Sequence, residues 1–469
     1  MPQSRIHNHF TLVLVMLGIA ARIAAVIVLR SPTLPRSTYE HGEIAANLLT
    51  GRGFSTHFLG AFGPTSQQAP VYPFLVAGAF ALGGIETERS LWILQLAQCA
   101  LGGLLVWGVI RLANRWVPRC PAVGWIAGLI AALHPTLVYC ATHVQVAGLA
   151  ATLLVWFLLL GEEAAGLGRT RALVWSGLVL GILILSDPIM GLAALALPLA
   201  YARNRAWGDG IRGCLVTAGI TSLVVAPWIA RNYAVHGEFV PVKSSFGYAF
   251  WQGNCRLSEG TDKVVRASVD RIFEKSSGSL REQNAALWAA RHEAGYLDDI
   301  ALSQADKAFL GRHSEPERSR ILLARALGEL NEDAGRYARL CLRRLQYFWL
   351  FDETNPKTRV WLYRAPHLAL SVFALFGLGI ALAQRRGAIV PGLVVVLSIA
   401  LFHVLTITSA RFHIPIEPVM TIWAAIGVHG IASTIGKRHR AHFFTSASAG
   451  MVPRPHVPGF AYPRRPTVS

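Results

Sequence analysis

Two glutamates, Glu40 and Glu43, lie three residues apart in a polar, glycine-rich stretch between apolar segments, residues 37–73. Residues with this spacing share one face of a helix. The apolar side chains within Ile44–Leu49 would form a stripe behind them, and the helix is predicted to end at Thr50–Gly51, because glycine readily adopts the left-handed cap conformation. A carboxylate beside a membrane can accept a proton from an attacking hydroxyl, so the pair is a candidate general base. The alternative is that both carboxylates are solvated on an amphipathic surface helix.

Aromatic side chains accompany this pair along the chain. Tyr39 precedes Glu40, Phe54 follows the predicted helix, and Tyr72 lies near the end of the stretch. Aromatic rings offer flat apolar surface to a carbohydrate or lipid, and neighbouring glycines permit close approach to the backbone. We expect these three aromatic residues to line a substrate cleft.

Two further charged residues interrupt apolar stretches. Asp187 lies in the sequence Ser186-Asp187-Pro188, and a carboxylate there must be paired, protonated or near water. Its simpler interpretation is a cap on the helix that begins at Pro188. Arg22 lies within the first apolar segment, so we expect it to face protein, water or a phosphate, or else to reach the membrane surface along a tilted helix.

The composition indicates a multi-pass membrane protein. The chain has 469 residues, of which 53% are hydrophobic and 15% are charged, whereas a soluble domain has roughly 25% charged residues. Several apolar runs reach the ~20 residues that a spanning helix needs. The net charge is +18, but the basic residues lie mainly beside apolar segments, which favours a membrane protein over a nucleic-acid-binding one. The first apolar run lacks a small-residue cleavage site and is expected to be a retained anchor.

The order of apolar and polar segments predicts an all-α polytopic membrane protein with roughly ten to twelve transmembrane helices. Residues 1–230 form an N-terminal transmembrane module, in which residues 31–69 are an external acidic loop. Residues 231–345 are polar and form a soluble, mainly helical external insert. Residues 346–436 return to the membrane, and residues 437–469 form a basic tail that we expect to be disordered.

Basic residues conflict with a strict alternation of spans. If the acidic loop is external, alternation also places Arg111, Arg115 and Arg119 outside, against the positive-inside rule. The basic residues between 203 and 212 fit a cytoplasmic loop instead. One resolution is that the apolar segment Pro70–Gly84 does not cross the membrane.

Three sequence segments, in order along the chain, resemble a known family. The first contains Glu40-x-Gly42-x-Ile44-Ala45 followed by LLTGRGFS, GPT and PVYP, the second is Ala226–Asn254, and the third is Arg411–Pro418, RFHIPIEP. The chain resembles the GT-C class of integral-membrane glycosyltransferases, in particular the bacterial branch related to protein O-mannosyltransferases and aminoarabinose transferases. The resemblance implies a GT-C-like bundle of transmembrane helices with a small external insert.

The resemblance also implies an activity. Such enzymes transfer a sugar from a polyprenyl-phosphate donor to a glycan, lipid or protein acceptor, with inversion, at the external (periplasmic) face of the bacterial inner membrane. A first-loop carboxylate acts as the general base, and by position in the motif that residue is Glu40, with Glu43 as the second candidate. Relatives often have an aspartate at this position, sometimes as an Asp-Glu pair, whereas Tyr39 precedes Glu40 here.

Cationic side chains near the same face would stabilise the anionic leaving group. Arg231 and Lys243 flank the second segment and Arg411 begins the third, so these three are candidates for binding the donor phosphate. For Arg231 the alternative is an interfacial anchor. Arg343 and Arg344, where the chain returns to the membrane, are expected to contact lipid head groups.

No cofactor is predicted from the sequence; some relatives of the wider class use a divalent metal ion, so such an ion is possible here, but no motif supports it. The six cysteines contain no CxxC pair, and neither HExxH nor a phosphate-binding glycine loop occurs. His134 and His143 flank a predicted membrane boundary and are expected at the interface rather than as metal ligands.

Two other functions are compatible with the same hydropathy: a transporter or flippase of a lipid-linked glycan, and a non-catalytic assembly subunit. A transporter is expected to have broken helices in matching halves, with polar groups at mid-membrane depth. The polar residues of this chain instead concentrate in one early loop and one insert.

Overall fold

The structure, a computed structural model, describes residues 2–34, 37–204, 207–262, 278–279, 281–282, 285–286, 296–297 and 300–449. It is almost entirely helical. The elements up to the insert are α1 (Pro2–Val28), α2 (Tyr39–Leu49), β1 (Ser55–Phe58), β2 (Ala61–Pro64), α3 (Val71–Gly83), α4 (Glu88–Trp116), α5 (Pro121–Leu133), α6 (Pro135–Tyr139), η1 (Cys140–Thr142), α7 (Ala147–Leu167), α8 (Thr170–Ile184), η2 (Pro188–Leu195), α9 (Ala196–Asn204) and α10 (Trp207–His236). The remaining elements are α11 (Phe246–Asn254), β3 (Tyr296–Leu297), β4 (Ile300–Ala301), α14 (Gln304–Leu310), α15 (Glu315–Glu332), α16 (Ala334–Trp349), η3 (Pro356–Arg359), α17 (Trp361–Ala383), η4 (Gly387–Ile389), α18 (Val390–Leu405), η5 (Ile414–Ile416) and α19 (Glu417–Ala449).

The predicted all-α polytopic fold is confirmed. Among the described residues, 7 helices are long and apolar enough to cross a membrane, and the pair of helical segments Pro121–Leu133 and Pro135–Thr142, bent by 52°, makes up to 8. Two further apolar helices, α3 and α8, are shorter. The sequence prediction of ten to twelve spans counted such short segments as well.

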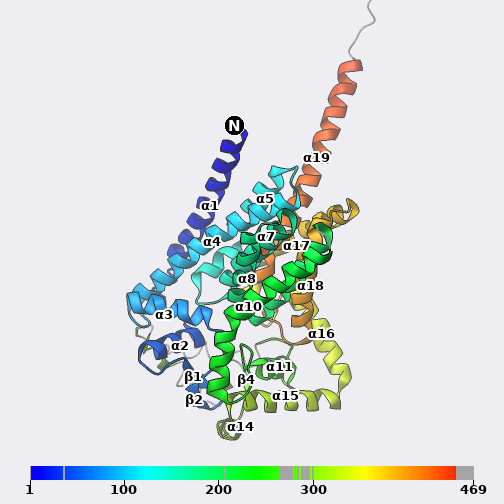
Figure 1. Cartoon of the computed structure of the whole chain (residues 1–469). Helices are drawn as coiled ribbons and strands as arrows, with labels where there is room; N and C mark the ends of the chain where they lie inside the picture. The colour runs from blue at the N-terminus through cyan, green and yellow to red at the C-terminus, as the bar shows by residue number, and fades with distance from the viewer. Residues whose placement is uncertain are drawn as a thin grey trace, which may run out of the picture.

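The two ends of the helical bundle differ (Figure 1). The N-terminus of α1 and the far end of α19 lie at one end, which we call the terminal end. The helices α2, α11, α14 and α15 and the β1–β2 hairpin lie at the opposite end, which we call the loop end. Helix α2 and the β1–β2 hairpin of the first loop therefore meet helices α11, α14 and α15 of the insert at the same end of the molecule.

Helix α3 explains the conflict between basic residues and alternation. Its 13 residues extend only about 20 Å, less than the ~30 Å of membrane hydrocarbon. Helix α4 then returns to the terminal end, where Arg111 Nη2 lies 2.6 Å from Glu163 Oε1 of α7. Arg203 of α9 pairs there with Glu162 of α7. The basic residues at the end of α4 and in α9 thus lie at one end of the bundle.

Helix α19 lies at the centre of the packed core, with most of Ile414–Thr434 buried. It packs closely against α17 because glycines face each other across the contact. A Cβ atom at Gly377 would lie 1.8 Å from the carbonyl oxygen of Trp423, and one at Gly427 would lie 2.6 Å from the carbonyl oxygen of Phe373. Small residues at such crossings let membrane helices approach closely.

Two of the expected arginine environments can be compared with the structure. Arg22 is buried in protein, where its guanidinium donates to the carbonyl oxygen of Gly18 at 2.8 Å. The sequence predicted that Arg344 contacts lipid head groups, and this prediction is wrong. The side chain is buried in protein and is 0% exposed. It donates to the carbonyl oxygens of Val404 at 2.6 Å and Gly253 at 3.0 Å. These carbonyls lie at the ends of α18 and α11, where helical partners are missing, so Arg344 caps two helix C-termini.

At the C-terminus, α19 continues to Ala449, into the segment predicted to be a disordered tail. Residues 450–469 lie outside the described residues, so the disorder of the tail stays a prediction.

Candidate functional site

The acidic helix forms as the sequence predicts. Helix α2 begins at Tyr39, ends at Leu49, and is followed by Gly51 with φ +79°, the left-handed conformation expected of a glycine at a helix end. Tyr39 also has a positive φ, +51°, which is unusual for a non-glycine residue. Its side chain is exposed, whereas Glu40, in the first turn, is partly buried. An anionic side chain in the first turn interacts favourably with the helix dipole.

Glu43 joins α2 to the β1–β2 hairpin. Its Oε2 accepts a hydrogen bond from Thr56 Oγ1 at 2.7 Å, and its Oε1 accepts one from the backbone N–H of His57 at 3.0 Å. The ring Nδ1 of His57 lies 2.6 Å from the same oxygen. Both carboxylate oxygens are therefore bound to β1. Although Glu40 and Glu43 belong to one helix, their surroundings differ.

Lys243 lies where four distant segments meet. Its ammonium group donates to Gln68 Oε1 at 3.2 Å. Burial lowers the pKa of Lys243, the charges of Asp187 and Glu40 oppose that change, and the charge of Arg411 reinforces it. The charges of Glu40, Arg411 and Asp187 thus all act on the ammonium group of Lys243.

His41 belongs to this group, and the sequence did not single it out. Burial, followed by the charges of Lys243 and Arg411, lowers the pKa of His41 to about 3, so its ring is neutral at physiological pH. The ring packs edge-on against Tyr72 at 4.9 Å between centroids. Tyr72 in turn donates its hydroxyl proton to Gln98 Oε1 at 2.7 Å. Tyr72 is therefore a buried side chain that touches this group of residues only by packing against His41, among the contacts described.

Asp187 caps a helix, as the sequence predicts, and its negative charge also acts on Lys243. Its Oδ1 accepts a hydrogen bond from the backbone N–H of Ile189 at 3.2 Å, at the start of η2. The backbone N–H of Val71 donates to the carbonyl oxygen of Leu185 at 3.1 Å, which places the break between α8 and η2 beside the start of α3. Asp187 and Pro188, which interrupt the apolar stretch, therefore lie close to the first loop.

Arg411 has a protein partner. Its Nη2 lies 3.5 Å from Asp262 Oδ2, and the Arg411 side chain is 53% exposed. A backbone hydrogen bond also joins the two segments that carry Arg411 and Asp262, because the N–H of Thr408 donates to the carbonyl oxygen of Gly260 at 3.1 Å. A half-exposed guanidinium at this position keeps a positive charge near the surface of the loop end.

Arg231 contacts Phe54, both its carbonyl oxygen and its ring, and not Glu40. The guanidinium of Arg231 donates to the carbonyl oxygens of Thr65 at 2.6 Å and Phe54 at 3.0 Å. It also lies 4.8 Å from the ring centroid of Trp228 and 5.3 Å from that of Phe54. This arrangement supports the first loop against α10. The expected cleft residues Tyr39, Phe54 and Tyr72 thus have separate surroundings.

A carboxylate that the sequence did not indicate joins the insert to the first loop. Glu315, 7% exposed, accepts hydrogen bonds from Thr65 Oγ1 at 2.6 Å, the backbone N–H of Ser66 at 2.7 Å and Ser244 Oγ at 2.6 Å. Ser244 is the neighbour of Lys243, so Glu315 fixes the segment that carries Lys243. No local pattern signals this role, since the partners lie 71 and 250 residues away.

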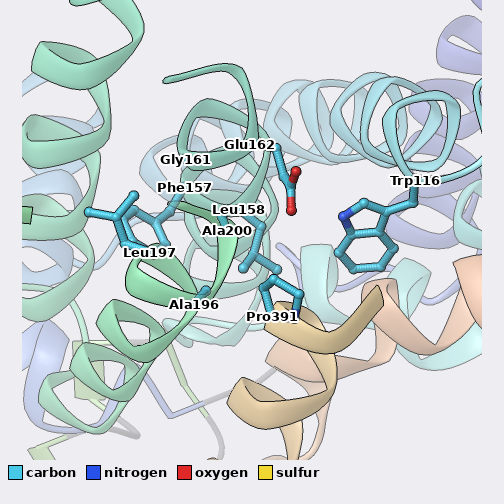
Figure 2. A pocket seen from close by; sticks show the side chains of 9 residues that line it. All are labelled: Trp116, Phe157, Leu158, Gly161, Glu162, Ala196, Leu197, Ala200 and Pro391. Carbon is cyan, nitrogen blue, oxygen red and sulfur yellow. The ribbon is translucent and has the colours of Figure 1, made fainter. Parts of the chain in front are cut away.

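A small cavity lies elsewhere, between α4, α7, α9 and α18 (Figure 2). It is lined largely by apolar side chains, and the Glu162 carboxylate and the Trp116 indole nitrogen face the same space. Glu162 is paired with Arg203. This cavity contains none of the residues around Lys243.

The comparisons with known proteins identify the fold. No family model matches the sequence, and no curated protein matches it. The structure is similar to the oligosaccharyltransferase of Archaeoglobus fulgidus in the apo form, with a TM-score of 0.54 and 14% identity over 93% of this chain and 52% of that chain. The same protein tethered with an acceptor peptide containing the NVT sequon gives 0.52 and 14% over 91% and 50%.

A further match is ArnT from Cupriavidus metallidurans bound to undecaprenyl phosphate, at 15% identity over 90% of this chain and 77% of that chain, but its TM-score of 0.38 is too low to support a shared fold. The chain spans about half the length of the oligosaccharyltransferase, 52%. The chain therefore shares its fold with that oligosaccharyltransferase, in agreement with the bundle of transmembrane helices that the sequence resemblance implies.

Proposed function

We propose that this chain is a membrane glycosyltransferase that moves a sugar from a polyprenyl-phosphate donor to an acceptor hydroxyl, with Glu40 as the general base. The observation that carries the proposal is that the charges of Glu40 and Arg411 both act on Lys243, which is bound to Gln68 of the first loop, although the three residues come from segments far apart in the sequence. The fold shared with an oligosaccharyltransferase supports it.

The chemistry requires one base and one anion site. The acceptor hydroxyl attacks the anomeric carbon while Glu40 takes its proton, and the bond between that carbon and the donor phosphate oxygen breaks. The configuration inverts, and polyprenyl phosphate leaves with the bonding electron pair. A positioned base contributes ~10²–10⁴-fold to such a step.

Lys243 and Arg411 supply the positive charge that the leaving phosphate needs. The charges of both act on His41, the neighbour of Glu40, and charge-assisted hydrogen bonds to phosphate are stronger than neutral ones. Arg231 is bound to backbone carbonyls, so we assign it to support of the loop and not to the donor. Glu43, bound to β1, supports the hairpin.

The position of the site suggests how substrates reach it. The loop end carries the polar first loop and the insert, whereas the basic ends of α4 and α9 lie at the terminal end. By the positive-inside rule the loop end faces away from the cytoplasm. We infer a bacterial inner-membrane protein whose donor lies in the outer leaflet and whose glycan, lipid or protein acceptor approaches from the periplasm.

The test compares the purified wild-type protein with the Glu40→Gln variant. Each is given a panel of candidate donors, undecaprenyl-phosphate-linked pentoses and hexoses. Mass spectrometry measures release of undecaprenyl phosphate and sugar transfer to extracted envelope glycans. We expect Glu40→Gln to lose about 100-fold or more of the turnover while keeping its melting temperature. The matched control is Glu238→Gln, a glutamate at the same end whose partner is Arg320.

Near wild-type turnover by Glu40→Gln would show that another group is the base. A transporter or flippase is distinguished in the same experiment, because it moves the intact lipid-linked sugar across vesicles without releasing undecaprenyl phosphate. Envelope glycans compared with and without the protein identify the transferred sugar and its acceptor together.

A further inference from the structure

A second cluster of polar side chains lies inside the helical bundle. His134 follows α5, His367 belongs to α17, His413 precedes η5, and Glu417 begins α19. Their side chains are 4%, 2%, 3% and 0% exposed, respectively. Burying four polar side chains together is costly unless their polar atoms are satisfied.

The polar atoms of this cluster converge on the Glu417 carboxylate. Its Oε1 lies 3.0 Å from His413 Nδ1 and 3.5 Å from His367 Nδ1, and its Oε2 lies 3.6 Å from His134 Nδ1. None of these atoms makes a hydrogen bond of acceptable geometry within the described part of the chain.

The outer nitrogen of His367 determines what its inner nitrogen can do. His367 Nε2 lies 3.1 Å from the carbonyl oxygen of Trp349. A carbonyl only accepts, so Nε2 carries the hydrogen, and the Nδ1 of a neutral His367 presents a lone pair to Glu417. His413 Nε2 contacts the hydroxyl of Tyr363 at 2.9 Å; because a hydroxyl can donate or accept, this contact does not fix which His413 nitrogen carries the hydrogen. A lone pair that faces a carboxylate oxygen in a buried site requires a cation between the two atoms or an extra proton on the ring.

The spacing of these atoms fits a metal ion. Tetrahedral ligands at the ~2.0–2.1 Å bond length of zinc are about 3.3–3.4 Å apart, and the observed separations are 3.0 and 3.5 Å. The ligand atoms of His367, His413 and Glu417 lie within 4.8 Å of one another, and a bound ion would draw the most widely spaced pair closer together. Hydrogen bonds on the outer nitrogen, as in His367, orient metal-binding imidazoles.

We propose that His367, His413 and Glu417 bind one divalent metal ion of the zinc class, with His134 as a fourth ligand beside the second oxygen of Glu417. Imidazole with carboxylate is a ligand set that suits zinc. The ion would join the α5–α6 bend, α17 and the start of α19. Because Arg411 lies two residues before His413, the ion would also fix the turn that carries Arg411.

The first experiment measures metal in the wild-type protein. The full chain is purified in detergent with a tag that contains no histidine, stripped with a chelator, reloaded with Zn²⁺ and dialysed. We expect about one equivalent of zinc by mass spectrometry and a higher melting temperature than that of the stripped protein. Reloading with Co²⁺ should give the visible absorption of a tetrahedral site. A folded wild-type protein that retains neither ion would overturn the proposal and leave a protonated histidine–carboxylate cluster.

Variants then locate the ion. His367→Ala and Glu417→Gln should each lose the bound zinc and the Co²⁺ spectrum. His403→Ala is the matched control, because His403 is also a buried histidine but its Nδ1 contacts the carbonyl oxygen of Ile407 at 3.0 Å. Retention of a full equivalent of zinc by both cluster variants would show that the ion binds elsewhere. If the variants do not fold, the Zn²⁺ and Co²⁺ measurements on the wild-type protein decide.

Discussion

At the scale of single residues, the two glutamates of α2 show why spacing alone does not assign a role. Both lie on one short helix, but Glu43 is bound through both oxygens to the β1 strand, whereas Glu40 lies within range of Lys243. A base must be able to reach the acceptor hydroxyl. We therefore keep Glu40, which the sequence motif indicates, as the proposed base and assign Glu43 to the support of the hairpin.

The titration of Lys243 gives a prediction for donor binding. Burial lowers its pKa below the usual range near 10.4, and a lysine is cationic only below its pKa. Binding of an undecaprenyl-phosphate sugar should therefore be strong at neutral pH and weaken as the pH rises through this lowered pKa. Gln68, Glu40, Asp187 and Arg411 surround the ammonium group.

The measurement is donor affinity from pH 6 to 10 in wild type, Lys243→Met and Lys243→Arg. Lys243→Met should bind the donor weakly at every pH. Lys243→Arg should remove the alkaline decline, because arginine stays charged throughout this range. His41 does not produce the decline, since its pKa is about 3. An unchanged alkaline decline in Lys243→Arg would assign the titration to another group.

The sequence singles out those candidate site residues that carry their own signal. Glu40 and Arg411 belong to recognisable motifs, and Asp187 interrupts an apolar run. Glu315 and Glu417 could not be predicted, because their roles depend on partners from distant segments. The role of Arg231 was not accessible either, since only the folded chain shows that carbonyl oxygens occupy its guanidinium.

At the scale of elements, local chemistry predicts some boundaries well. The end of α2 follows from Gly51, and the break between α8 and η2 follows from Asp187 and Pro188. The β1–β2 hairpin was not predicted: each strand has four residues, and the hairpin depends on contacts from α2 and the insert. Short strands contain too little periodicity to be recognised.

The crossing of α17 and α19 gives a prediction about packing. Gly377→Ala would place a methyl group 1.8 Å from the carbonyl oxygen of Trp423, so the helices must separate. We expect a loss of about 1–3 kcal/mol in the free energy of unfolding, typical of an overpacked core. The lower melting temperature of purified Gly377→Ala in detergent would show it.

The matched control lies two residues away in the same helix. A Cβ atom at Gly379 meets nothing within 4 Å, so Gly379→Ala should be neutral, or more stable by up to about 1 kcal/mol because alanine favours helix. Equal melting temperatures for the two variants would mean that the α17–α19 contact does not depend on the small residue.

At the scale of the whole molecule, the candidate site depends on the position of α3. Since α3 is too short to cross, the first loop, the break at Asp187 and the insert all reach the loop end. The basic ends of α4 and α9 then lie together at the terminal end. If α3 crossed the membrane, the two ends of α3 would face opposite compartments, and the positive-inside rule would be violated at Arg111.

Single cysteines in the full chain can test this arrangement. The six native cysteines are replaced by serine or alanine, and a membrane-impermeant maleimide is added to intact spheroplasts or to permeabilised ones. Arg52→Cys and Arg89→Cys lie in exposed positions on either side of α3, and both should react in intact spheroplasts. Arg119→Cys and Arg169→Cys, exposed beyond the ends of α4 and α7, should react only after permeabilisation. Because Arg52→Cys and Arg89→Cys differ only in their side of α3, opposite accessibility of these two variants would mean that α3 spans the membrane and that the first loop and the start of α4 cannot share the loop end.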